Sequence, residues 1–314
     1  MKRKKIKVSI FGFSVLFFVL FCAFASLYTF WKSPFGFFGC EVESDSCDVL
    51  RVHFLSVGSA DSIVIEFSKK GCSSCYALVD AGDIGSHEVC DYLYKLNVKK
   101  INYAFLTHPH RDHLGQFPEV LGSFQVDMFV TNKNATNFEK YGITSKKLWE
   151  IVKEKGIPFK FVMSGARFLL GEVEIFVLGP VFDYGDAEKN LNDSSLVLSV
   201  RFKNRAFLLT GDATSKSERD LIENCKDCLQ ADLLKLGHHG GGGSTSSKFL
   251  RHVSPSVAVL CAGNQESVAK KGYLRALKYG VPVYKTCDGN VVVTTDGVSP
   301  LTIKTERASL RGAA

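Results

Sequence analysis

Three imidazoles and one carboxylate stand within six residues in the segment His108-Pro109-His110-Arg111-Asp112-His113. The segment follows an apolar stretch, residues 102–106, that is typical of a buried strand, and its proline disfavours a helix through it. A loop at the end of a strand can turn all four side chains toward one point. Neighbouring histidines repel one another when protonated, whereas neutral imidazoles and a carboxylate bind a divalent cation. The spacing therefore predicts a metal site.

The segments around this motif alternate between strand-like and helical patterns. Short apolar or alternating runs between turn residues indicate strands, and apolar residues spaced by three or four indicate helices. Such interleaving predicts a layered α/β (α+β) domain with helices covering the sheets. The expected strands are 51–57, 62–67, 76–80, 102–106, one ending at 129–130, 173–178, 195–202, 206–210, 233–236, 257–260, 281–284 and 291–295. The expected helices are 88–96, 146–155, 217–223 and 268–279, with a short one after the histidine motif.

Composition places the chain among folded proteins. It has 314 residues, of which 46% are hydrophobic, and that is enough to bury a core. The formal net charge is +7, but five of the positive charges stand in the first seven residues. The remainder is near neutral, so its overall charge does not indicate nucleic-acid binding.

An uncharged segment, residues 8–31, follows the basic N-terminus. As a helix it would be about 36 Å long, enough to cross a bilayer core of about 30 Å. The basic residues favour a cytoplasmic N-terminus and an extracytoplasmic body. Ala23 and Ala25 before Ser26 leave a cleaved signal peptide, and hence a secreted protein, as the alternative to a single-pass anchor. We expect residues 1–7 to be cytoplasmic, 8–31 transmembrane, 32–48 a linker, 49–305 the folded domain and 306–314 a tail.

Nine of the ten cysteines lie beyond the apolar segment. They include two Cys-x-x-Cys pairs, Cys72 with Cys75 and Cys225 with Cys228. In an exported body these residues are typical of disulfides, and a four-thiolate zinc site is the alternative.

Six short motifs follow one another along the chain. They are His53 to Asp61, Asp80 in Leu78-Val79-Asp80-Ala81-Gly82, the His108–His113 motif, Asn192-Asp193-Ser194-Ser195-Leu196, Thr210-Gly211-Asp212 and Gly237-His238-His239-Gly240. With them the chain resembles the metallo-β-lactamase fold superfamily. More narrowly it is similar to the extracytoplasmic hydrolase domain of the ComEC/Rec2 competence proteins, which are DNA-uptake channel proteins. The resemblance implies a four-layer αβ/βα sandwich over most of the exported body.

The resemblance also implies two divalent metal ions, Zn²⁺ or Mn²⁺. His108 and His110 would hold the first; Asp112, His113 and His238 would hold the second; and Asp212 would bridge them. The remaining expected roles are support of the ligand loop by Asp80, a place near the first ion for Asn192 or Asp193, support or proton transfer by His239, and phosphate or substrate contacts by Gly240, Ser244 and Lys235. Asp112, Asp212 and His239 are thus the candidate catalytic residues.

One departure from the family pattern concerns the segment after Gly263-Asn264. A Tyr-x-His-Pro element usually follows, and here the chain continues Gln265-Glu266-Ser267. The expected function is a membrane-anchored, extracytoplasmic hydrolase that cuts phosphodiesters, with DNA as substrate and other DNA-uptake proteins as partners. The alternatives are hydrolysis of a lactam, lactone or thioester, and a metal-stabilised binding or assembly module without catalysis.

Overall fold

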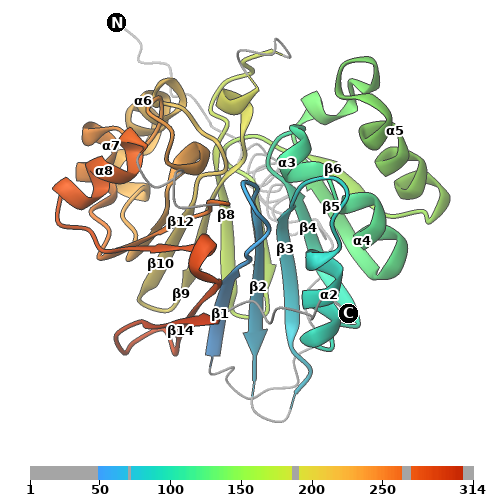
Figure 1. Cartoon of the computed structure of the whole chain (residues 1–314), viewed down its shortest axis with the longest axis horizontal. Helices are drawn as coiled ribbons and strands as arrows, with labels where there is room; N and C mark the ends of the chain where they lie inside the picture. Colours follow the sequence, from blue (N-terminus) through green and yellow to red (C-terminus); the bar gives the residue numbers. More distant parts are fainter. Residues whose placement is uncertain (1–48, 70–71, 186–190, 264–269, 307–314) are drawn as a thin grey trace, which may run out of the picture. The chain divides into compact units, whose positions relative to one another are not determined.

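Apolar strands build two β-sheets that face each other across the core (Figure 1). The computed structural model describes residues 49–69, 72–185, 191–263 and 270–306, all within the structural unit Phe38–Ala314. The first sheet has the order β15 (Thr302–Glu306), β14 (Asn290–Thr295), β1 (Val49–Phe54), β2 (Ser62–Ser68), β3 (Cys75–Ala81), β4 (Lys100–Leu106), β5 (Gln125–Thr131) and β6 (Phe159–Phe161). The second has the order β13 (Val283–Lys285), β12 (Val257–Leu260), β11 (Leu233–Lys235), β10 (Arg205–Leu209), β9 (Val197–Phe202), β8 (Val173–Gly179) and β7 (Arg167–Leu170).

Alternate residues of these strands fill the space between the sheets. In β1, Leu50, Val52 and Phe54 are buried there, as the period of two along a strand requires. The rings of Phe67 and Phe202, from opposite sheets, meet edge to face at 5.3 Å. This packing joins the two sheets into one core.

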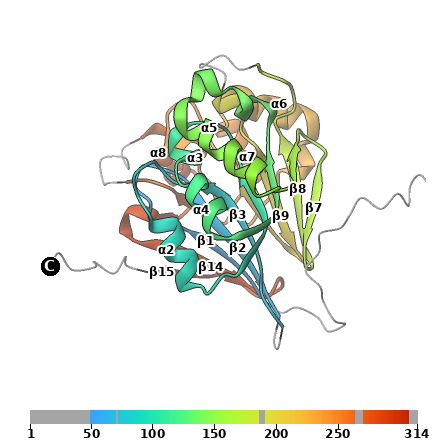
Figure 2. The ribbon, with the colours of Figure 1, turned by 90° about the vertical axis from the view of Figure 1, so that its right-hand side faces the viewer.

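Helices cover the outer face of each sheet, and their apolar residues form a second and a third buried cluster. Figure 2 shows α4 and α5 in front of the first sheet. The helices packed on the first sheet are α2 (Glu88–Lys95), α4 (Phe117–Ser123) and α5 (Phe138–Glu154), with the short α3 (Arg111–Leu114) at its edge. Those packed on the second are α6 (Ser215–Cys225), α7 (Ser247–Val253) and α8 (Lys271–Lys278). The predicted four-layer α/β arrangement is therefore confirmed.

A few elements differ from the sequence predictions. Strands β6, β7 and β15 were not expected, and helix α8 is shorter than the predicted helix over 268–279. Glu306, expected in a tail, ends β15 and pairs with Lys95 (Nζ to Oε2, 3.0 Å). The predicted transmembrane segment 8–31 lies outside the described residues. No helix within the described ranges has the length and apolarity needed to span a bilayer.

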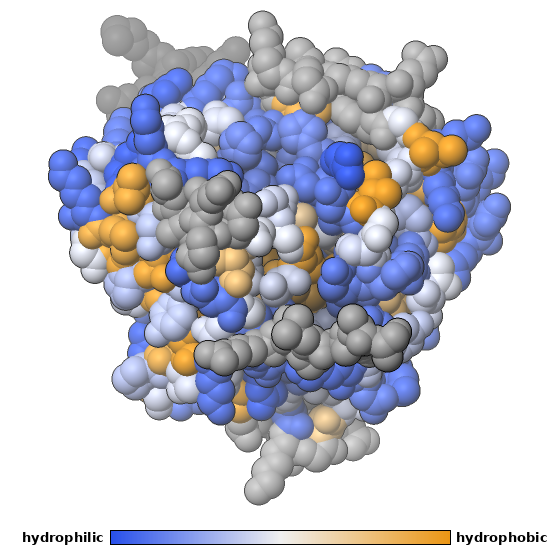
Figure 3. All heavy atoms as spheres, viewed as in Figure 1, coloured by the Kyte–Doolittle hydropathy of each residue, from blue (hydrophilic) through white to orange (hydrophobic). Residues whose placement is uncertain are grey.

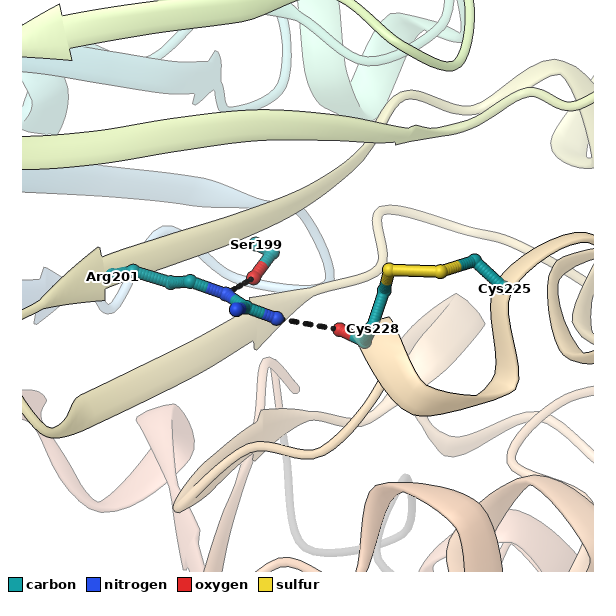
Figure 4. Close-up of a disulfide and its surroundings, with 4 residues drawn as sticks. All are labelled: Ser199, Arg201, Cys225 and Cys228. Carbon is teal, nitrogen blue, oxygen red and sulfur yellow. Dashed lines mark hydrogen bonds between the residues drawn. A yellow bond between two sulfur atoms is a disulfide. The ribbon is translucent and has the colours of Figure 1, made fainter.

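Cys225 and Cys228 form a disulfide where α6 ends (Figure 4). Arg201 of β9 donates to the carbonyl of Cys228 at 3.1 Å and ties this turn to the second sheet. Cys75 is also disulfide-bonded, whereas Cys72 is a free, exposed thiol. The two Cys-x-x-Cys pairs therefore do not form the alternative four-thiolate zinc site.

Parallel strands of both sheets end at the same edge of the sandwich. β3 and β4 run parallel in the first sheet, and β10, β11 and β12 do so in the second. The backbone N–H of Leu196 donates to the carbonyl of Thr107 at 3.0 Å and joins the strand-end segments of the two sheets. The candidate metal ligands lie in the loops that follow these strands.

Candidate metal centre

Four potential metal ligands converge between the two sheets. Asp112 and His113 lie in α3 after β4, Asp212 follows β10, and His239 lies in the one-turn segment after β11. One ligand atom from each residue can be chosen so that all four lie within 4.8 Å of one another. His113 Nε2 lies 3.4 Å from Asp212 Oδ2 and 3.8 Å from Asp112 Oδ2. His239 Nε2 lies 3.1 Å from Asp112 Oδ2. We call these four residues the four-ligand cluster.

Asp80 fixes the orientation of His113. Its carboxylate accepts hydrogen bonds from the backbone N–H and the hydroxyl of Thr107, both at 2.7 Å, and from Nδ1 of His113 at 2.7 Å. Since Nδ1 faces Asp80, Nε2 is the nitrogen that faces Asp112 and Asp212 and that would coordinate a cation. Asp80 is only 1% exposed, as a supporting carboxylate beneath the ligand loop must be.

A second group of imidazoles lies beside this cluster. The ring of His108 is 4.2 Å from the ring of His113, and its Nε2 is 2.9 Å from Nδ1 of His110. Across the site, Asn192 Nδ2 lies 3.3 Å from Nε2 of His238, which is itself 3.9 Å from Asp212 Oδ2. His108, His110, Asn192 and His238 thus lie beside the four-ligand cluster, but among the described residues none of the three histidines belongs to a group of three or more histidine, cysteine or carboxylate ligands close enough to hold an ion.

The structure corrects the expected use of the two adjacent histidines. His239 and not His238 completes the four-ligand cluster, and the side chain of His238 is 43% exposed. Both residues have left-handed backbone angles, with φ of 47° and 48°. Such angles are uncommon outside glycine and turn the two rings in different directions.

Of the two residues expected near the first cation, Asn192 faces the site and Asp193 does not. Asp193 accepts a hydrogen bond from the hydroxyl of Thr214, and Lys216 Nζ lies 3.8 Å from its Oδ2. The side-chain oxygen of Asn192 is buried and has no hydrogen-bond partner among the described residues. The amide side chain is therefore the one left to meet a ligand.

The carboxylates set the pKa values of the neighbouring imidazoles. Burial lowers the pKa of His113, but the charges of Asp212 and Asp80 outweigh it and hold that pKa well above its ordinary value. Burial likewise lowers the pKa of His239, and Asp212 and other carboxylates raise it above the usual value. For His108, burial and the charge of His113 hold the pKa well below its ordinary value. The four-ligand cluster thus attracts positive charge, while His108 favours a neutral imidazole.

These residues fit a divalent cation. Nε2 of His113 and Oδ1 of Asp212 are buried and have no hydrogen-bond partner in the described part of the chain. Buried polar atoms without partners are rare, because each one costs free energy unless a ligand satisfies it. Nitrogen and carboxylate oxygen donors without a thiolate suit Zn²⁺ or Mn²⁺.

Lys235 occupies a different place from the one expected. Its side chain is fully buried beneath the cluster, and the substrate contact expected of it stays a prediction. Its Nζ lies 2.5 Å from Asp61 Oδ2 and donates to the carbonyl of Gly211 at 2.8 Å. Asp61 also lies 3.5 Å from Nδ1 of His239. The sequence alone assigned Asp61 no role at the metal site. The available signal is a single carboxylate placed directly before the buried strand β2.

Gly240 and Ser244, which we expected to contact a phosphate, lie in the segment that follows His239. Both residues are buried, and the hydroxyl of Ser244 donates to the carbonyls of Gly237 and Gly241 at 2.7 and 2.9 Å. Gly237 in turn donates its N–H to the hydroxyl of Thr245 at 3.1 Å. These hydrogen bonds hold the histidine loop in shape, and the phosphate contacts expected of Gly240 and Ser244 stay predictions.

The family follows from the sequence match as well as from the fold. Residues 57–264 match the family model of the metallo-beta-lactamase superfamily. That match covers more than half of the chain, so the chain belongs to this superfamily, whose fold supports metal-dependent hydrolysis. Its two-sheet α/β sandwich and candidate ligand cluster agree with that membership.

Two curated proteins show the nature of its relatives. ComE operon protein 3 of Bacillus subtilis (strain 168) is 28% identical over 180 residues, which are 57% of this chain and 22% of that protein. Competence protein ComA of Neisseria gonorrhoeae is 26% identical over 208 residues, which are 65% of this chain and 25% of that protein. The chain thus spans about a quarter of the length of these relatives. Among solved structures, Igni18, a metallo hydrolase from Ignicoccus hospitalis KIN4/I, superposes with a TM-score of 0.49 at 14% identity, over 79% of this chain and 98% of that one.

Proposed function

We propose that this protein is a membrane-anchored, extracytoplasmic, binuclear metal-dependent phosphodiesterase that acts on DNA. The observation that carries the proposal is the convergence of Asp112, His113, Asp212 and His239 on one point, with His108 and His110 beside it. Two divalent ions held there would polarise a phosphoryl group and lower the pKa of a water molecule for attack.

Different residues of the chain would hold the two ions. The four-ligand cluster would bind one ion, and His108 with His110 would bind the other. Asp80 accepts the Nδ1 proton of His113, so Nε2 is the nitrogen that would face an ion, and the partly exposed ring of His238 is able to exchange a proton with solvent at the mouth of the site.

The charge of the site favours a phosphodiester over a neutral lactam or lactone. The site contains four negative charges, on the buried or half-buried carboxylates of Asp61, Asp80, Asp112 and Asp212, and one positive charge, on the ammonium of Lys235. Two divalent cations would leave this region with about one positive charge, which complements the single negative charge of a phosphodiester. The names of the two relatives, a ComE operon protein and a competence protein, support a link to DNA uptake.

The proposed topology has its own support. The basic residues before segment 8–31 favour a cytoplasmic N-terminus, and the Cys225–Cys228 disulfide agrees with a body outside the cytosol. An alkaline phosphatase fused after Lys32 should be active; an inactive fusion would contradict this orientation.

Hydrolysis of bis-p-nitrophenyl phosphate tests the reaction. We expect turnover by the metal-loaded protein, loss of turnover after chelation, and recovery when Zn²⁺ or Mn²⁺ is restored. Asp112→Ala should abolish turnover, and Asp227→Ala, an exposed carboxylate away from the site, should not change it.

A substrate panel separates the alternatives. Turnover of nitrocefin, a lactone or a thioester without turnover of any phosphodiester would contradict the proposed substrate class. Stoichiometric metal binding with no turnover of any ester or amide would instead indicate a metal-stabilised binding or assembly module.

A further inference from the structure

Helix α8 turns its leucines away from the body of the protein. Its buried residues are Gly272 and Ala276, whereas Leu274 is 51% exposed and Leu277 is 43% exposed. Just beyond the helix, Tyr279 is exposed as well. Figure 3 shows apolar residues beside hydrophilic ones on the side of the molecule where Figure 1 places α7 and α8. A helix packed through its small residues leaves its apolar face available to a partner.

Cations surround this apolar face. Between Ser244 and Asp288 the described residues include seven lysines and arginines and one acidic residue. Since the chain beyond its basic N-terminus is near neutral, this stretch concentrates positive charge on one part of the body. We call it the α7–α8 surface, and its members are Lys248, Arg251, Lys270, Lys271, Leu274, Leu277, Lys278 and Tyr279.

We propose that the α7–α8 surface docks on a lipid bilayer that contains anionic lipid. Lysines and arginines would meet the lipid phosphates, and Leu274 and Leu277 would enter the boundary between headgroups and acyl chains. A basic helix with exposed apolar side chains is typical of proteins that lie on a membrane surface.

The mixture of side chains distinguishes a bilayer from other partners. A nucleic-acid backbone would pair with the lysines but would leave Leu274 and Leu277 in water. A second copy of this chain would bring two cationic surfaces together, and their charges would repel. A bilayer offers phosphate and acyl chain at adjacent depths and therefore satisfies both kinds of residue.

Docking there would also position the metal centre, because α8 is joined closely to the histidine loop. A Cβ on Gly272 would lie 2.7 Å from the carbonyl oxygen of Gly240, so the two backbones are in direct contact. Arg275 donates to the carbonyls of Ser244 and Thr245 at 2.8 and 2.6 Å. A bilayer that binds α8 would therefore also hold the loop carrying His239 at a fixed height above the bilayer surface.

Tryptophan quenching in the full chain tests the docking. Leu277→Trp places a fluorophore on the α7–α8 surface, and Ile143→Trp places one at an apolar residue of α5 that is 84% exposed, as the matched control. Each protein is reconstituted in nanodiscs of phosphatidylcholine with brominated phosphatidylglycerol as quencher, and the emission of the wild type, from Trp31 and Trp149, is subtracted. We expect the Leu277→Trp signal to be quenched and the Ile143→Trp signal to be unchanged.

Removal of charge provides the second arm. The Leu277→Trp protein is also made with both Lys271→Gln and Lys278→Gln. These two substitutions should lower the ratio of protein with the α7–α8 surface bound to the bilayer to protein with that surface unbound about 25-fold, roughly fivefold for each lysine. Salt at about 1 M, where the Debye length is roughly 3 Å, should weaken the quenching in the same direction. All these residues are exposed, so near-ultraviolet circular dichroism of the variants should match the wild type.

Three results would overturn the proposal. Equal quenching of the two tryptophans would mean that the surface has no preference for lipid. Quenching that survives the double glutamine substitution would mean that the cations do not hold it. Lysine-dependent binding of a fluorescent DNA duplex, without quenching by brominated lipid, would assign the surface to nucleic acid instead.

Discussion

Replacing Lys235 by methionine tests how the metal centre keeps its carboxylates together. Lys235 is fully buried, and its Nζ lies 2.5 Å from Asp61 Oδ2 and 3.8 Å from Asp212 Oδ1. Burial lowers the pKa of a lysine, but the charges of Asp61 and Asp212 outweigh it and hold the pKa of Lys235 above its ordinary value. The side chain is therefore a buried ammonium that neutralises part of the surrounding negative charge.

The expected magnitude follows from that burial. Methionine keeps most of the side-chain volume and removes the charge, so the measured loss reports on the ion pair. Removing one partner of a buried pair leaves the other charge uncompensated and costs about 3–5 kcal/mol in the free energy of unfolding. Adding Asp61→Asn removes the stranded carboxylate, so the double variant should be more stable than the two single losses predict, by about 0.5–3 kcal/mol.

Urea unfolding of the unit Phe38–Ala314, followed by far-ultraviolet circular dichroism without metal, measures these losses. Lys153→Met removes an exposed lysine of α5 and should change the unfolding free energy by less than about 0.5 kcal/mol. Added Zn²⁺ or Mn²⁺ should stabilise Lys235→Met, because binding to the folded state alone favours it. A midpoint for Lys235→Met equal to that of Lys153→Met would refute the reasoning.

Three further predictions concern the ligand loop, the histidine pair and the response to acid. Asp80→Asn should lower metal affinity about 10–100-fold in calorimetric titration, because the carboxylate that orients His113 is lost. His239→Ala should reduce bound metal, measured by mass spectrometry, more than His238→Ala does; equal losses would contradict the four-ligand cluster. Burial raises the pKa of Glu66, but hydrogen bonds from His53 and a serine hold it below the ordinary value of 4.5. Stability from Glu66 is therefore complete above that value and is lost as the pH falls toward the lower folded pKa. Glu66→Gln should flatten the fall of the melting temperature in acid, and an unchanged slope would exclude this contribution.

Most of the fold was predictable because its central strands are buried on at least one face. A strand such as β8 shows alternating burial along its length, and the sequence shows the matching period. Strand β6 (Phe159–Phe161) was missed because all three of its residues are exposed at a sheet edge, so it has no buried face. Strand β15 was missed for a related reason, since it is an edge strand without fully buried residues.

Site residues were predictable where potential metal ligands stand close together in the sequence, and not where the partners are far apart in the sequence. His108, Asp112 and His113 stand together in the sequence, and their spacing alone indicates a metal site. The pair formed by Asp61 and Lys235 joins two distant segments, and neither residue is unusual by itself. Asp61 precedes β2 of the first sheet and Lys235 ends β11 of the second, so only the packing of the two sheets against each other brings the two charges together.

The choice between His238 and His239 shows a second limit, which lies in the backbone. The left-handed backbone angles of His238 and His239 each cost about 1–3 kcal/mol of conformational free energy. No pattern of residues in the sequence predicts such angles. The contacts of the following segment hold this conformation, through the hydroxyl of Ser244 and the guanidinium of Arg275. A loop under such strain persists because the surrounding structure fixes it, and here it directs His239 into the four-ligand cluster and His238 toward solvent. The same contacts tie the loop to α8, so the residues that keep the strained histidines in place also link the metal centre to the α7–α8 surface.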